Sequence, residues 1–353
     1  MWLLGVLHGV ADATTGYLLI SLSYSSNAMT IEGVARFLLV YNVLAFAMQP
    51  VFGWGLDRLH HSRKYSGGAA SGLTLIVLAL VLSLQSPLLA VAVAGLGSAL
   101  FHIGAGAMAM SECRALHCGA FAAPGVIGQA LGMSMGLFTH ALLPGFVVLL
   151  SLVALLLWKT KPPQLAVDAL LLESSFAPKL TQLQITLLLL VLAIALRSSI
   201  WTLWQAIATG NKLLVLGLCL AAGGGKLMGG FFAEKWEATH YTVGALVVSG
   251  LFLVGVEQSS AHPILRYILI FAGIACLQSA TPGALIALKT VLPTRPAVAA
   301  GLGFGFAIAL GGLPDLLRFN IQALILPIAL LSALLFYIAA RKSRIAALST
   351  NSC

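Results

Sequence analysis

Charged side chains are scarce in this sequence. Asp, Glu, Lys and Arg together make up 8% of its 353 residues, against roughly 25% in an average soluble domain. Apolar residues make up 60% of the chain, and the mean hydropathy is +1.01. The core of a soluble domain cannot bury that much apolar surface, whereas a lipid bilayer can. We therefore expect an all-α protein that crosses a membrane many times.

Disulfide and cofactor signals are also missing. The five cysteines are odd in number and scattered, so no disulfide framework is indicated. Cys113 and Cys118 lack the second ligand pair that a metal centre would need. The sequence contains neither the P-loop pattern Gly-x-x-x-x-Gly-Lys-Ser/Thr nor the zinc motif His-Glu-x-x-His. We expect no enzyme activity, no cofactor, no resident metal and, from the apolar start without a cleavage site, no signal peptide.

Twelve apolar stretches are long enough to predict membrane-spanning helices, since a span needs ~20 apolar residues. They cover residues 2–22, 33–56, 67–84, 88–110, 120–140, 142–158, 182–206, 212–233, 241–256, 264–287, 297–313 and 321–340. A polar segment separates the first six from the last six. We predict a six-helix bundle over 1–158, a cytoplasmic linker over 159–180 and a second six-helix bundle over 181–353.

The distribution of basic residues predicts the orientation. An even number of spans puts both termini on one side, and that side carries 13 of the 19 Lys and Arg residues. They are Arg58, Arg63, Lys64, Arg114, Lys159, Lys161, Lys179, Lys235, Lys289, Arg295, Arg341, Lys342 and Arg344. Because basic loops stay in the cytoplasm, both termini are expected there. The bias accounts for the net charge of +9, and no soluble basic module is present to bind nucleic acid.

One short motif occurs once in each half of the chain. The stretch Gly53–Arg58 reads Gly-x-x-x-Asp-Arg, and Gly230–Lys235 reads Gly-x-x-x-Glu-Lys. Their acids are 177 residues apart (234 − 57), half the length of the chain. Two six-helix halves with the same orientation form a parallel repeat, which allows one half to rock against the other around a central site.

The repeated motif suits a cytoplasmic gate. A carboxylate at the end of a span can accept hydrogen bonds from the start of a neighbouring helix and can pair with a base. Such contacts would hold one conformation until they break. A plain basic loop with incidental acids is the alternative. The predicted gate residues are Gly53, Asp57, Arg58, Gly230, Glu234 and Lys235.

The first span carries two ionisable residues one turn apart. His8 and Asp12 share one helix face, and a carboxylate inside a membrane is a functional candidate because it is costly when ionised. Asp12 can hold a proton when shielded from water and release it when water enters, and His8 can share that proton. The alternative is a structural hydrogen bond for Asp12 and an interface position for His8.

Four motifs resemble those of a known family. They are His8-x-x-x-Asp12, Gln49-Pro50-Val51-x-Gly53-x-x-x-Asp57-Arg58, Gly95-Leu96-Gly97-Ser98-Ala99-Leu100-Phe101-His102 and Leu196-Arg197-Ser198. With its six plus six predicted spans, the chain resembles the major facilitator superfamily of transporters, and within it the fosmidomycin-resistance branch. That branch usually continues Phe-His with a proline, whereas this chain has Ile103-Gly104.

The resemblance implies a proton-coupled antiporter for drug efflux in the inner membrane of a bacterium, with spans one, four, seven and ten lining a central cavity. His102 in span four is assigned to proton coupling with Asp12 and His8, and a histidine that merely satisfies a carbonyl is the alternative. Arg197 in span seven cannot shed its proton, so it needs a carboxylate, a carbonyl or an anionic substrate.

Span ten contains a polar break next to Pro282, which either lines the cavity or is a packing kink. The predicted substrate-cavity residues are Arg197, Trp201, Gln278, Ser279 and Thr281.

The function expected from the sequence is proton-coupled efflux of a small amphiphilic or anionic compound by rocker-switch alternating access. Its partners would be that substrate, protons and the lipid bilayer, and a monomer suffices because one chain contains both halves. Two alternatives stay open. One is an importer or exporter of a metal ion, metal chelate or nutrient, since His8, Asp12 and His102 suit a divalent metal. The other is a non-transporting membrane sensor or scaffold.

Overall fold

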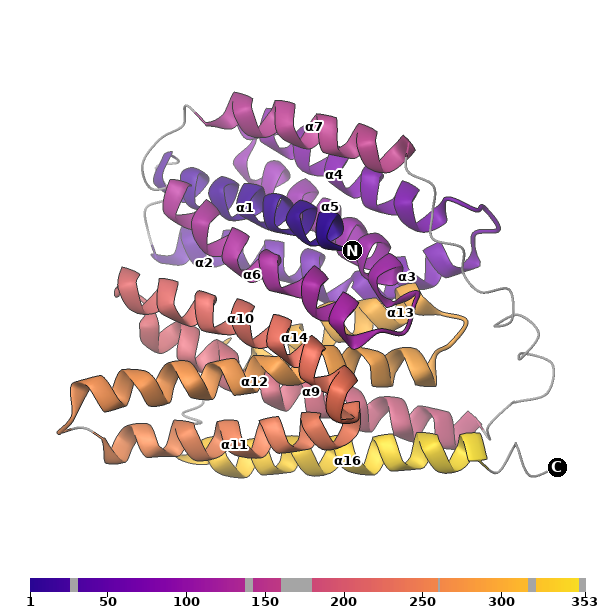
Figure 1. The fold of residues 1–353 in the computed structure, drawn as a ribbon. Helices are drawn as coiled ribbons and strands as arrows, with labels where there is room; N and C mark the ends of the chain where they lie inside the picture. Colours follow the sequence, from indigo (N-terminus) through magenta and orange to yellow (C-terminus); the bar gives the residue numbers. More distant parts are fainter. Residues whose placement is uncertain (26–30, 137–141, 160–179, 260, 317–321, 349–353) are drawn as a thin grey trace. The chain divides into compact units, whose positions relative to one another are not determined.

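A computed structural model describes the chain except for residues 26–30, 137–141, 160–179, 260, 317–321 and 349–353 (Figure 1). The described residues form helices and connecting turns, without a strand among them. The prediction of an all-α chain is therefore confirmed for this part. The predicted linker, 159–180, lies almost wholly outside the described residues.

The helices of the first sequence half follow one another with short connections. They are α1 (Trp2–Ser25), α2 (Ile31–Asn42), the π-helical η1 (Val43–Ala47), α3 (Gln49–Arg58), α4 (Lys64–Leu82), α5 (Pro87–Met110), α6 (Ala115–Gly136) and α7 (Leu143–Lys159). Prolines stand at the starts of α3 and α5, where the missing N–H group costs nothing.

The second sequence half also consists of helices in its described residues. It contains α9 (Leu180–Ala208), α10 (Lys212–Trp236), α11 (Ala238–Gln258), α12 (Pro263–Val291), α13 (Pro296–Ala300), the π-helical η3 (Gly301–Phe306), α14 (Ala307–Gly311), α15 (Leu313–Leu316), the 3₁₀-helical η4 (Gln322–Leu324) and α16 (Ile325–Leu348). The Asn211 side chain caps α10 by accepting from Leu214 N, and the Glu237 carboxylate caps α11.

Each of the twelve predicted spans overlaps a helical stretch of the described residues. Nine helices in this part of the chain are long and apolar enough to cross a membrane, and two shorter apolar helices, Leu143–Lys159 and Pro296–Gly311, accompany them. The chain is thus an integral membrane protein. Two spans differ from the prediction: the second and the eleventh contain the π turns η1 and η3 instead of uninterrupted α-helix.

The predicted polar run in span ten interrupts the apolar sequence but does not interrupt the helix. The helix α12 runs without interruption from Pro263 to Val291, with Pro282 inside it. Proline removes one backbone hydrogen bond from a helix interior, but the helix continues on both sides. The polar residues at 278–281 therefore stand on a continuous helix.

The chain divides into two compact units. The first contains Met1–Ser111, Pro124–Pro163 and Arg295–Phe306, and the second contains Glu112–Ala123, Gln164–Thr294 and Ala307–Cys353. In the first unit α4 packs against α5 and α7, and in the second α12 packs against α10 and α11, while α16 packs against α9 and α11 (Figure 1). Each unit thus takes in a short segment from the opposite half of the sequence.

Glycines on α6 set the distance between α6 and α1. A Cβ added at Gly128 would clash with the backbone of Gly9, and one at Gly132 would clash with the backbone of Ala13. Small residues four apart allow two membrane helices to approach closely. The face of α1 that carries Asp12 is therefore fixed against α6 by backbone contact.

Candidate functional site

Three ionisable side chains meet in the interior of the first unit. The carboxylate of Asp12 lies 3.1 Å from His8 Nε2 through Oδ2 and 3.5 Å from His102 Nε2 through Oδ1. The two Nε2 atoms are 2.9 Å apart. Both histidines are buried, while the Asp12 side chain keeps 16% of its surface exposed. We call His8, Asp12 and His102 the cluster.

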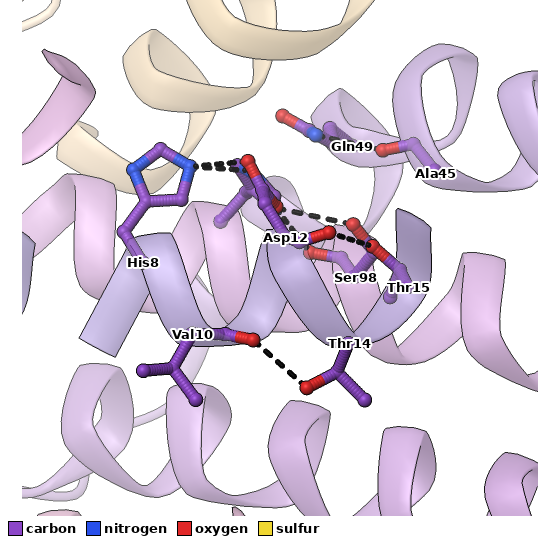
Figure 2. A network of polar contacts seen from close by, with 9 residues as sticks. His8, Val10, Asp12, Thr14, Thr15, Ala45, Gln49 and Ser98 are labelled. Carbon is purple, nitrogen blue, oxygen red and sulfur yellow. Dashed lines mark hydrogen bonds and ion pairs between the residues drawn. The ribbon is translucent and has the colours of Figure 1, made fainter. Parts of the chain in front are cut away.

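The helices α1 and α5 supply the cluster and its polar surroundings. Figure 2 shows His8 and Asp12 on one face of α1, with Thr15 and Ser98 beside the carboxyl group. Thr15 Oγ1 donates to the backbone carbonyl of Asp12 at 3.2 Å. Thr14 points away from the cluster and donates to its own helix at Val10 O (Figure 2). The side of α1 that carries His8 and Asp12 thus also carries Thr15.

The orientation of His102 is fixed by a hydrogen bond behind it. Its Nδ1 lies 2.8 Å from the carbonyl oxygen of Ser98 and 3.2 Å from the Ser98 hydroxyl. Because a carbonyl oxygen only accepts, Nδ1 carries a proton, and in the neutral ring Nε2 can accept from His8 Nε2. Histidines that bind metals or relay protons are oriented in the same way by a second contact.

Gly125 on α6 makes room for the cluster, and sequence analysis did not single it out. A Cβ at this position would lie 2.5 Å from the His8 ring and 2.9 Å from Asp12 Oδ2. The signal that could have found it is its spacing, since Gly125 lies one turn before Gly128 and two turns before Gly132, which pack on α1. A larger residue here would push His8 or Asp12 out of place.

The cluster can hold either protons or a metal ion. With Asp12 ionised and both imidazoles neutral its net charge is −1, and binding one proton makes it neutral. A divalent ion also fits the spacing, because bonds of about 2.0–2.2 Å place neighbouring ligand atoms of one ion about 2.9–3.5 Å apart. In the cluster the two Nε2 atoms are 2.9 Å apart, and one ligand atom from each of the three residues lies within 4.8 Å of the others. Imidazole and carboxylate are ligands that suit first-row divalent ions.

Asp57 caps the start of α13. Its Oδ1 accepts from Ala297 N at 3.2 Å and its Oδ2 accepts from Val298 N at 2.9 Å. These are the second and third residues of α13, whose N–H groups have no acceptor within their own helix. Tyr65 donates to Oδ1 from its hydroxyl at 2.8 Å. The carboxylate therefore holds together α3, α4 and α13.

Glu234 caps the start of α6 in the same manner within the second unit. Its Oε1 accepts from Leu116 N at 3.0 Å, and its Oε2 accepts from Arg114 Nη2 at 3.2 Å. Arg114 was predicted only as a basic loop residue, and no local pattern indicates its pairing with Glu234, which lies 120 residues away in the sequence. In each half an acid thus binds the start of a helix that follows an arginine.

The glycine four residues before each acid explains the spacing of the motif. A Cβ at Gly53 would lie 2.5 Å from Ala297 O, and a Cβ at Gly230 would lie 2.8 Å from Ala115 O. Glycine therefore lets the capped helix approach, and the acid one turn later reaches the N–H groups. We call these two arrangements the latches.

The basic residues of the two motifs lie elsewhere. The guanidinium of Arg58 stands 3.6 Å over the ring of Trp54, a cation–π contact. Lys235 takes part in none of the ion pairs that the described residues form. The bases that touch the latches are Arg114 and Lys64, and Lys64 Nζ donates to the backbone carbonyl of Asp57 at 2.9 Å.

Arg197 lies buried in the second unit and bonds to neutral oxygens. Its Nη1 donates to Gln278 Oε1 at 3.0 Å and to Thr281 Oγ1 at 2.6 Å, both on α12. Its Nη2 reaches the hydroxyl of Ser198 at 3.5 Å. The structure thus joins three of the five predicted cavity residues into one network.

The other two predicted cavity residues stand outside that network. Ser279 donates to the carbonyl of Cys276 on its own helix at 2.8 Å. Trp201 lies on α9 one turn after Arg197 and is partly exposed. The Trp204 indole N–H is buried without a hydrogen-bond partner.

A Gly-x-Ser-x-Gly string is present at residues 132–136, and sequence analysis passed over it. In a hydrolase this pattern requires a sharp turn between a strand and a helix. Here it lies inside α6, and Ser134 Oγ donates to Ala130 O at 2.9 Å. The string is thus part of a packing helix and forms no nucleophile elbow.

No protein-family model and no curated protein sequence matches this chain. Solved structures do match. A crystal structure of the E. coli fucose:proton symporter FucP has a TM-score of 0.69 at 15% identity, covering 97% of this chain and 96% of that one. A second FucP structure, described as a major facilitator superfamily transporter in the outward conformation, gives the same values. The chain has the major facilitator fold.

Another match with this fold is a bacterial homologue of the iron transporter ferroportin in the outward-facing state. It has a TM-score of 0.60 at 14% identity and covers 97% of this chain and 98% of that one. The TM-scores and the coverage of the whole chain establish the fold, whereas sequence identities of 14–15% are too low to transfer a function. The prediction of a twelve-helix major facilitator architecture is confirmed.

Proposed function

We propose that the protein is a proton-coupled secondary transporter that works by rocker-switch alternating access. The observation that carries the proposal is the cluster. Its charge changes from −1 to neutral on binding one proton, and such a change alters the cost of keeping the cluster in a low-dielectric interior. Asp12 binds the proton, and His8 and His102 share it and keep the carboxylate in place.

The two latches supply the conformational step in this proposal. Asp57 and Glu234 each bind a helix start that lies in the opposite half of the sequence. If the halves are rigid bundles, 1–158 and 181–353, their relative motion separates each acid from its helix start. The latches then close the cytoplasmic side, with both termini in the cytoplasm and the protein in the inner membrane of a bacterium.

The substrate in this proposal is a small amphiphilic or anionic compound, and the direction is export. Arg197, Gln278 and Thr281 form a buried cationic and polar network. Trp201 and Ser279 lie on the same two helices, α9 and α12. The fosmidomycin-resistance branch, which the sequence motifs resemble, favours antiport and drug efflux. FucP, by contrast, is a symporter, so the direction has to be measured.

Accumulation of a compound panel, including fosmidomycin, tests this function in cells that lack their own efflux pumps. Wild type is compared at equal expression with Asp12→Asn and with Thr14→Val, whose hydroxyl bonds only to its own helix. Export is supported if wild type and Thr14→Val lower accumulation of a compound and Asp12→Asn does not. The proposed proton coupling fails if Asp12→Asn transports as wild type does in both cells and proteoliposomes. Absence of transport by wild type in both systems would favour a sensor or scaffold.

A second candidate function is transport of a divalent metal ion. The specific observation is that His8, Asp12 and His102 each turn a ligand atom toward the others, and that these three atoms lie within 4.8 Å of one another. His102 also has the orienting contact to Ser98 that metal-binding histidines have. A match with the fold of a ferroportin homologue is consistent with metal as the substrate.

Metal binding to the purified protein separates the two candidates. Zn²⁺, Mn²⁺ and Fe²⁺ are added to protein in detergent, and the melting temperature is followed at pH 7.5 and pH 5.5. A metal site stabilises the protein at pH 7.5 and loses its effect at pH 5.5, because protons compete for the imidazoles. His8→Ala and His102→Ala should each abolish the stabilisation. An equal response in these variants rules out the cluster as the metal site.

A further inference from the structure

A pocket lies at the surface of the second unit, between the start of α11 and the end of α16. Its volume is about 270 Å³, and it is lined by Thr239, His240, Tyr337 and Arg341. Thr239 is partly exposed and the other three are exposed, so a ligand can reach each of them from outside. The two helices pack side by side (Figure 1). We call this space the α11–α16 pocket.

An exposed apolar stripe runs along α16 and ends at the pocket. Leu330, Leu334 and Tyr337 are 45%, 53% and 38% exposed, and their spacing places them on one helix face with Arg341. In a membrane, exposed leucines contact acyl chains. Tyrosine rings lie at the level of the lipid headgroups, and a long basic side chain reaches outward beyond them. The order from Leu330 to Arg341 therefore matches the order from acyl chain to headgroup.

A second stripe leads from the same pocket along α11. His240, Gly244, Val248 and Leu251 are exposed and share one face of this helix. Val248 is 40% exposed and Leu251 is 58% exposed. A Cβ added at Gly244 would meet nothing within 4 Å, so there is open space one turn below His240. The pocket thus adjoins apolar surface on both helices that form it.

The α16 side of the pocket is cationic. The guanidinium of Arg341 stays protonated in proteins, and the ion pairs that the described residues form do not include it. The sequence continues with Lys342 and Arg344 and contains no acid between Tyr337 and the end of the chain. Basic side chains at the edge of a membrane attract anionic lipids.

The acid beside the pocket is already engaged by the start of α11. Glu237 accepts from Thr239 N and from His240 N, each at 3.3 Å. Its Oε2 also forms an ion pair with His240 Nδ1. Glu237 is not one of the lining residues. Its negative charge therefore serves the helix start and the His240 ring, and Arg341 is left to attract an anion.

We propose that the α11–α16 pocket binds the phosphate headgroup of an anionic phospholipid, whose acyl chains lie along the two apolar stripes. Arginine binds phosphate through two parallel N–H bonds, and the Tyr337 hydroxyl can donate another. A free phosphate ion would use the same donors but would leave the apolar stripes without a role. The ammonium group of a zwitterionic lipid would be repelled by Arg341. This site shares no residue with the cluster, the latches or the Arg197 network, so it does not depend on the proposed transport function.

Native mass spectrometry of the purified protein tests the headgroup. Delipidated protein is incubated with phosphatidylglycerol or with phosphatidylcholine of the same acyl chains, and the retained lipid is counted. Wild type should retain phosphatidylglycerol about five-fold better or more. Arg341→Gln should lose this preference. Arg266→Gln is the matched control, because it removes an exposed arginine at the start of α12, ~30 Å along α11 from the pocket, and it should keep the preference.

Two further measurements complete the test. Excess inorganic phosphate should not displace the bound phosphatidylglycerol, since it lacks acyl chains. Structure determination of wild type in phosphatidylglycerol nanodiscs should show a headgroup beside Tyr337 and Arg341, whether or not Arg341→Gln folds. The proposal is overturned if wild type retains both lipids equally, if the two arginine variants lose the preference equally, if phosphate displaces the lipid, or if no headgroup lies in the pocket.

Discussion

His8 and His102, from helices α1 and α5, face each other through Nε2 atoms that are 2.9 Å apart. Two imidazole nitrogens at this distance need one proton or one cation between them, because two lone pairs would repel and two N–H groups would collide. Asp12 lies beside both rings and supplies the negative charge. The predictions below test this arrangement and the two latches.

Asp12→Asn should abolish proton-driven accumulation. The amide cannot take up the proton that changes the charge of the cluster, so substrate movement loses its link to the pH gradient. In proteoliposomes we expect uptake driven by a pH gradient to fall at least about ten-fold, a barrier change of about 1.4 kcal/mol. Exchange of labelled for unlabelled substrate without a gradient should persist, and its loss would point to a binding or folding defect instead.

Gly125→Ala should disrupt the cluster, although Gly125 lies on the neighbouring helix α6 and is not one of its three residues. The new methyl group would lie 2.5 Å from the His8 ring, so His8 or α6 must shift. We expect a cost of about 1–3 kcal/mol, typical of overpacking, together with reduced proton coupling. Gly244→Ala, where nothing lies within 4 Å, is the control and should be neutral or slightly stabilising. Thermal unfolding and gradient-driven uptake of both variants provide the measurement, and equal behaviour would contradict the close contact.

Gly53→Ala should open the first latch. Its methyl group would lie 2.5 Å from Ala297 O, which pushes α13 away from the Asp57 carboxylate. We expect a loss of about 1–2 kcal/mol, the usual value of a helix cap, and slower transport. Gly55→Ala on the same helix meets nothing within 4 Å and should behave as wild type. Urea or thermal melts compare the pair, and the proposed latch is refuted if both glycines tolerate alanine equally.

The second latch should depend more on Glu234 than on Arg114. Removing the Arg114 side chain deletes an exposed ion pair, and such pairs contribute little in water. Removing the Glu234 carboxylate also leaves Leu116 N–H without its acceptor. Transport should therefore fall several-fold in Glu234→Ala and stay within about two-fold of wild type in Arg114→Ala. A reversed order would show that the ion pair, and not the helix cap, holds this latch.

Much of the architecture was predictable because its signals are local. Apolar length locates the spans, and the repeated motif marks Asp57 and Glu234 at equivalent places. His8 and Asp12 were paired from their four-residue spacing alone. The polar run at 278–281 was recognised from the sequence, but the continuation of α12 through Pro282 was not, since a proline within a helix often interrupts it.

The remaining parts of the site depend on contacts that no local pattern shows. The role of Gly125 depends on the place of α1 against α6, and Arg114 meets Glu234 across 120 residues of sequence. The π turn at 43–47 lies in apolar, helix-like sequence. The one at 301–306 contains three glycines, a local signal that was not used to predict it. The roles assigned to the cluster, the latches and the cavity residues stay predictions until the measurements above are made.

The capping of α13 by Asp57 has a consequence for synthesis on the ribosome. The carboxylate and its partner N–H groups are 240 and 241 residues apart. At a synthesis rate of roughly 5–20 residues per second, Val298 is added to the chain on the order of 10–50 s after Asp57. Throughout that interval the nascent first half carries an acid at its membrane edge with no helix to cap. The first half of the chain therefore completes its own structure only when the eleventh span emerges.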